Sequence, residues 1–105
     1  MTTVKINAGI CGFHSIIKVS AQGSRNAIVE METECPNLKP MAAELHDVNS
    51  FQECFAKVGE SPVFQLARKY CKHAACPVPT GIIKGIEVAC KLALPKKVEI
   101  ELEKD

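Results

Sequence analysis

The sequence predicts a single α+β domain, in which a small, mostly antiparallel sheet carries about four helices packed on one face. Two observations lead to this prediction. Segments with the two-residue alternation of strands lie near both ends of the chain, and segments with helical spacing fill the middle. The 105 residues, 47% of them apolar, suffice for one hydrophobic core and are too few for two. We therefore expect one domain over residues 1–105, with three N-terminal strands and one C-terminal strand.

Three strands are expected before residue 35. Residues 4–8 form a short first strand, and the glycines of "GICG" indicate a turn or bulge after it. Residues 13–21 alternate in polarity, and residues 27–34 do so again after the loop "QGSRN", so these two segments should form a hairpin. The face of the hairpin expected to be buried carries Phe13, Ser15, Ile17, Val19, Ala21, Ala27, Val29, Met31 and Thr33.

Four helices are expected next, because apolar residues recur at spacings of three and four. The first two cover residues 38–45 and 51–58. Ser61 followed by Pro62 is a favourable N-cap and first-turn pair for a third helix, which extends to residue 70. The fourth helix begins near Pro79 and is ended by Pro95. Its glycines at positions 81 and 85 should allow close approach to the sheet.

The C-terminal segment "KKVEIELEKD" has the alternation of a last strand. Its apolar positions are Val98, Ile100 and Leu102, and glutamates occupy the positions between and after them. One face of this strand is therefore expected to be buried.

Composition excludes several classes of function. The thirteen basic and twelve acidic residues are interspersed, which disfavours a nucleic-acid partner, and no apolar stretch is long enough to cross a membrane. The N-terminal residues do not have the pattern of a secretion signal, so we expect a cytoplasmic protein. In a reducing cytoplasm, six cysteines indicate free thiols or metal ligands rather than disulfides.

Four of these cysteines are expected at the ends of secondary-structure elements. Hairpin geometry places Cys11 and Cys35 near each other at its open end. Cys71 ends the third helix and Cys76 precedes the fourth, so one short corner joins them. A thiol at a helix N-terminus is favoured as the thiolate, and Cys76 is therefore predicted to be the most reactive of the six.

The remaining candidates have simpler interpretations. Cys54 and Cys90 fall on apolar helix stripes and are expected to pack in the core. His73 lies between Cys71 and Cys76, where its ring could be a metal ligand, or a helix-end residue that hydrogen-bonds to the last carbonyls.

The blocks "NAGICGF", "ECPNLK" and "ACPVPTGIIKGIEVACKLALP" resemble a small prokaryotic family of proteins of unknown function, from methanogenic archaea and anaerobic clostridia. The resemblance covers nearly the whole chain. It implies an anaerobic cytosol, in which oxygen-labile iron–sulfur or thiol chemistry is feasible.

A second, local resemblance concerns the segment "CPVPTGIIKGIEVACKLALPKKVEIEL", which is similar to the CPxP cysteine, helix and strand of the TusA/SirA-like sulfur carriers. In those proteins the cysteine at the helix start carries a persulfide. The similarity implies that Cys76 is the carrier and that Pro77 and Pro79 shape the turn. The motif lies near the N-terminus in that family, whereas here it follows three helices.

The sequence thus leads to one main hypothesis and two alternatives. The main hypothesis is a zinc or iron–sulfur centre held by Cys11, Cys35, Cys71 and Cys76, with His73 as a substitute ligand. The first alternative is sulfur transfer through Cys76, and either chemistry implies a protein partner in metal or sulfur transfer. The second is a small interaction module with free thiols and no chemistry.

Overall fold

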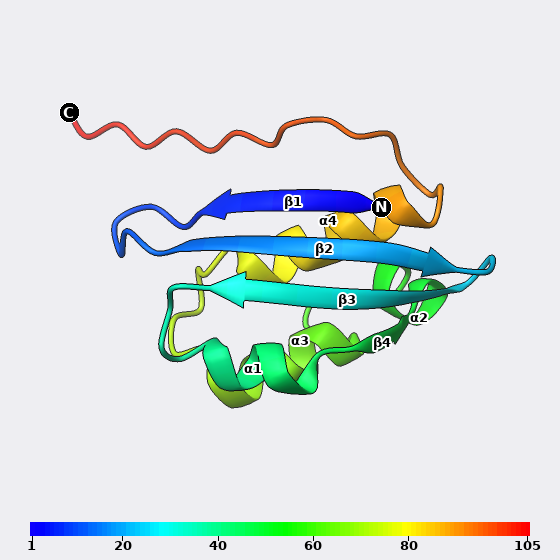
Figure 1. Ribbon diagram of the computed structural model, residues 1–105. Coiled ribbons are helices and arrows are strands. Elements are labelled where there is room, and N and C mark those ends of the chain that lie inside the picture. Colours follow the sequence, from blue (N-terminus) through cyan, green and yellow to red (C-terminus); the bar gives the residue numbers. More distant parts are fainter.

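A computed structural model describes residues 1–105 and shows an α+β fold. One antiparallel sheet has the strand order β1-β2-β3-β4, and the helices cover one of its faces (Figure 1). The strands are β1 (Thr2–Asn7), β2 (His14–Gln22), β3 (Asn26–Thr33) and β4 (Asp47–Asn49). The helices are α1 (Lys39–Glu44), α2 (Ser50–Cys54), α3 (Pro62–Tyr70) and α4 (Val78–Ala89). None of these helices is long and apolar enough to cross a membrane.

The β2–β3 hairpin follows the predicted alternation at its centre, but Phe13 and Ala21, which were predicted on the buried face, are exposed. Its register pairs Gln22 with Asn26 next to the turn and Ser15 with Thr33 at the open end. The inward positions form the centre of the core, and Ile17, Val19 and Val29 are fully buried. Because strand side chains alternate between the two faces, the other face of the hairpin remains open to solvent.

Local sequence signals set the start of α3. As predicted, Ser61 is its N-cap, and the Ser61 Oγ accepts a 3.4 Å hydrogen bond from the backbone N–H of Phe64. Pro62 follows in the first turn, where the missing N–H costs no helical hydrogen bond.

Helix α4 packs closely against β1 and β2 through the face that carries Ile82 and Ile86, both fully buried. The two glycines of this helix lie against β1, as predicted. A Cβ atom at Gly81 would collide with the Ile6 side chain, and one at Gly85 would lie 2.7 Å from Val4 Cγ2. A larger residue at either position would therefore displace a side chain of β1 or move α4 away from the strand.

The predicted C-terminal strand is wrong. Residues 91–105 contain no strand, and the fourth strand is β4, which pairs with β3 between α1 and α2. The segment 98–102 has the alternation of a strand but no hydrogen-bonded neighbour. In Figure 1 this segment (orange to red) runs in the same direction as β1.

Helix α4 also ends earlier than expected, before Pro95. Lys91 adopts a left-handed conformation with φ of 62°. The backbone N–H groups of Lys91 and Leu92 then bond back to the carbonyls of Val88 and Glu87, at 3.2 and 2.7 Å. This pattern completes the helix C-terminus and turns the chain away from the helix axis.

Candidate functional site

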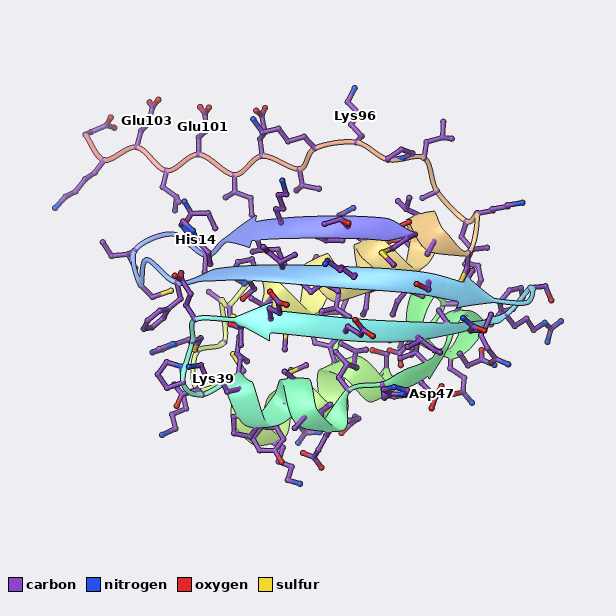
Figure 2. All side chains as sticks on the ribbon, in the orientation of Figure 1. His14, Lys39, Asp47, Lys96, Glu101 and Glu103 are labelled. Carbon is purple, nitrogen blue, oxygen red and sulfur yellow. The ribbon has the colours of Figure 1, made fainter.

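Three chain connections converge at one end of the sheet (Figure 1). They are the β1–β2 loop, the β3–α1 loop and the α3–α4 connection, which carry Cys11, Cys35 and the pair Cys71 and Cys76, respectively. Figure 2 shows His14 and Lys39 at this same end of the molecule. The four cysteines singled out from the sequence therefore belong to connections that the fold gathers together.

The α3–α4 connection brings Cys71 and Cys76 into contact. Cys71 caps the end of α3, and its N–H donates to the Ala67 carbonyl at 2.7 Å. The backbone carbonyl of His73 accepts from the Cys71 Sγ at 3.4 Å and from the Cys76 N–H at 3.2 Å. This carbonyl fixes a tight corner, in which the Cys71 thiol lies close enough to Cys76 to raise the pKa of Cys76.

Cys35 is the third member of the cluster and is held by the end of the β2–β3 ladder. Its N–H donates to Thr33 Oγ1 at 3.1 Å, and that hydroxyl forms a 2.8 Å hydrogen bond with Ser15 Oγ. Its carbonyl accepts from the N–H groups of Leu38 and Lys39 where α1 begins. Cys35 is thus fixed between a strand end and a helix start, and it is close enough to Cys76 to influence its ionisation.

The Cys76 thiol is not the activated thiolate that its position predicted. Burial raises the pKa of Cys76 to about 11. The N–H of Val78 opposes this shift, and the neighbouring thiols of Cys71 and Cys35 add to it. Pro77 and Pro79 have no N–H, so the start of α4 offers few of the donors that stabilise an anion at a helix N-terminus. The effect of desolvation and of the neighbouring thiols on the pKa of Cys76 is therefore larger than the stabilisation that the helix N-terminus gives to a thiolate.

Two predicted members of the site lie apart from this cluster. Cys11 is exposed in the β1–β2 loop, and His73 is exposed and contributes its backbone carbonyl. No group of three or more His, Cys, Asp and Glu side chains is arranged to hold a metal ion. Cys35, Cys71 and Cys76 thus lie near one another without the arrangement of a metal site, and no hydrogen bond links Cys11 or the His73 ring to them.

Residues 2–102 match a family described as "Family of unknown function (DUF6951)". The chain belongs to this family. No curated protein and no solved structure matches the chain. The part of this DUF6951 chain that matches the family contains all six cysteines and the segment 98–102.

Sequence reasoning missed a second thiol pair in this DUF6951 protein. Cys54 and Cys90 are partly buried and pack against the core, as predicted, but they also lie near each other. Burial, followed by the charges of Glu87, Cys90 and Glu53, raises the pKa of Cys54 to about 11. Only the packing of α2 on α4 reveals this proximity, because the two cysteines are far apart in sequence.

Proposed function

We propose that this protein binds zinc or an iron–sulfur cluster through Cys35, Cys71 and Cys76, with Cys11 from the β1–β2 loop as the fourth ligand. The observation that carries the proposal is the convergence of three cysteine-bearing connections at one end of the sheet. Thiolates from separate loops that meet at one point are the usual ligand set of structural zinc and of iron–sulfur clusters.

The surroundings of the three clustered cysteines support this proposal. Hydrogen bonds from outside a metal's ligand shell orient the ligands and stabilise them. Thr33 and the His73 carbonyl hold the backbone of Cys35 and of Cys76, respectively, so these positions are fixed before a ligand arrives. Metal binding requires the three thiols to move closer together, and the fourth position requires movement of the β1–β2 loop toward them. If Cys11 does not close the site, the exposed ring of His73 is the substitute.

Metal content after anaerobic purification tests the proposal. We expect zinc, or iron with acid-labile sulfide and visible absorption, in a fixed ratio to protein. Cys35→Ser, Cys71→Ser and Cys76→Ser should each lose the metal. Cys54→Ser and Cys90→Ser are matched controls, since each removes a partly buried cysteine at a distance from the cluster, and both should keep it. Comparison of Cys11→Ser with His73→Ala identifies the fourth ligand. Wild-type protein that binds neither zinc nor iron would refute the metal site.

The alternative function is sulfur transfer through Cys76. It is favoured by the position of this cysteine directly before α4, with Pro77 and Pro79 at the start of the helix. A cysteine desulfurase would form a persulfide on its own cysteine, and the Cys76 thiolate would attack the terminal sulfur. The sulfur would move to Cys76, and the desulfurase thiolate would be released with no net oxidation. The burial of Cys76 makes this the weaker candidate.

One incubation distinguishes the two functions. A carrier should gain the mass of one sulfur atom on Cys76 when it is mixed with a desulfurase and cysteine, and Cys76→Ser should gain none. A metal-binding protein should instead show protection of the clustered thiols from alkylation after zinc or iron is added. Either activity would place the protein in a reducing cytoplasm with a protein partner that supplies or receives the metal or the sulfur. If neither is observed, a small interaction module with free thiols is the remaining interpretation.

A further inference from the structure

The first strand of the sheet has a free edge. β1 pairs with β2 alone, so along residues 2–7 one side of the strand has backbone groups without a ladder partner. Natural sheets usually cover, shorten or charge such an edge, because it readily pairs with another strand. The edge of β1 is six residues long, and Lys5 is its one charged side chain.

The C-terminal tail has the properties of a strand that lacks a partner. No backbone hydrogen bond of the chain involves residues 94–105. The apolar side chains of the tail are exposed, by 54% at Val98, 74% at Ile100 and 91% at Leu102. Figure 2 shows Glu101 and Glu103 pointing away from β1, so the acidic and apolar positions fall on opposite sides of the segment.

The direction of the tail indicates whether it pairs with β1 of its own chain or with β1 of a second molecule. The tail and β1 run the same way in Figure 1, so pairing within one chain would add a parallel strand to an otherwise antiparallel sheet. Antiparallel pairs are the more stable. A second copy related by a twofold axis perpendicular to the sheet presents its tail in the opposite direction and keeps its helices on the same side. That tail can pair with β1 in the orientation of every other pair in the sheet.

We propose that two copies of this chain exchange their C-terminal tails, so that residues 98–102 of each copy form an antiparallel fifth strand on the free edge of β1 in the other. This dimer is isologous, as most homodimers are, because the same two segments meet twice. The tail is then a strand whose partner is another molecule, which accounts for its alternation and for its exposure within one chain.

The side chains match in this arrangement. Pairing Ile6 with Val98 and Val4 with Ile100 places the apolar tail residues on the helix side of the sheet. There, Ile6 and Val4 already face the glycines of α4. The same register sets Lys5 opposite Glu99 on the solvent side, where opposite charges across a strand pair are favourable.

The mass of the protein in solution tests the proposal. Light scattering after size-exclusion chromatography, with reductant present to exclude intermolecular disulfides, should give twice the 11.4 kDa of one chain. Ile100→Pro and a chain ending at Pro95 should both be monomers that keep the helical circular dichroism signal of a folded domain. Lys104→Pro is the matched control, since it adds proline to the tail outside the pairing segment, and it should remain a dimer. Lys5→Glu should weaken dimerisation by about tenfold.

Hydrogen exchange separates the remaining outcomes. In the dimer, the amides of residues 98–102 should be protected, and the protection should fade on dilution. A wild-type monomer at high micromolar concentration would overturn the proposal, whether its tail amides are free or are protected by the chain's own β1. A dimer that survives truncation at Pro95 would also overturn it, because the contact would then lie elsewhere.

Discussion

Glu53 Oε1 accepts a 3.0 Å hydrogen bond from the backbone N–H of Val63, and this bond ties the end of α2 to the first turn of α3. Burial raises the pKa of the Glu53 carboxyl, although the N–H of Val63 and the hydroxyl of Ser61 partly oppose the shift. The helix start is thus held by a buried acid whose charged form is disfavoured by its surroundings.

This relationship predicts a pH-dependent stability. Because the folded-state pKa of Glu53 lies above its ordinary value of 4.5, the folded protein binds this proton more tightly than the unfolded chain. The resulting stabilisation is present at acidic pH and is lost as the pH rises from 4.5 through the folded-state pKa. Glu53→Gln keeps an acceptor oxygen but cannot ionise, so its free energy of unfolding relative to wild type should increase over that interval. Urea denaturation at several pH values measures the difference.

The Glu53 contact itself is tested by Glu53→Ala, which leaves the Val63 N–H without its acceptor. We expect a loss of about 1–3 kcal/mol at neutral pH, because a buried donor is left unsatisfied. Glu60→Ala, at an exposed position before α3, is the control and should change stability little. Equal stability of Glu53→Ala and wild type would show that water replaces the carboxylate.

The packing of α4 on β1 predicts that Gly85→Ala destabilises the protein, although alanine favours helix formation. The added methyl group would lie 2.7 Å from Val4 Cγ2 and 3.2 Å from Val19 Cγ2. Such overpacking costs about 1–3 kcal/mol, and the gain in helix propensity of up to about 1 kcal/mol offsets part of it. The double variant Gly85→Ala/Val4→Ala should recover part of the loss in thermal denaturation. Lys84→Ala, on the exposed side of α4, should have almost no effect.

The left-handed conformation of Lys91 predicts a stabilising substitution. A non-glycine residue with φ of 62° is strained, whereas glycine adopts this conformation freely. Lys91→Gly removes this strain but also gives the unfolded chain more conformational entropy. The net effect should be a rise of about 0.5–1 kcal/mol in the free energy of unfolding. Lys96→Gly, in the exposed tail, is the control and should show no gain.

Burial of thiols predicts the order of alkylation in metal-free protein. The pKa of about 11 at Cys54 and at Cys76 leaves on the order of one thiolate in a thousand at pH 8. The exposed Cys11 should therefore react with iodoacetamide faster than either, and the rates at Cys54 and Cys76 should rise about tenfold for each pH unit up to that pKa. Peptide mass spectrometry after timed quenching gives each rate separately. Faster labelling of Cys76 than of Cys11 would contradict this order.

Much of the fold could be predicted because its signals are local. The alternation of β2 and β3, the Ser61 cap and the paired glycines of α4 each depend on a few neighbouring residues. Strand β4 escaped prediction because three residues carry no periodicity, and its identity depends on pairing with β3. The strand predicted over residues 98–102 is wrong for the opposite reason. Alternation shows that a segment can form a strand, but it does not show whether a neighbouring strand is present.

The candidate site was predictable only in part. The short corner before α4 indicated that Cys71 and Cys76 lie close together, whereas hairpin phase paired Cys35 with Cys11 and did not show that Cys35 lies near Cys76. The ionisation of Cys76 could not be inferred, because it depends on burial and on Cys35, which is distant in sequence. The missing N–H groups of Pro77 and Pro79 were visible in the sequence and could have tempered the expectation of a reactive thiolate.

Helix α4 has a thiol pair near each end, and between them its glycines fit against the side chains of Ile6 and Val4. Its twelve residues span about 18 Å. Sliding or turning this helix would press it against those two side chains. The helix therefore holds the two pairs of thiols apart. Oxidation or ligation at Cys76 should leave the reactivity of Cys54 and Cys90 unchanged, so that the protein holds two independent chemical environments within one small core.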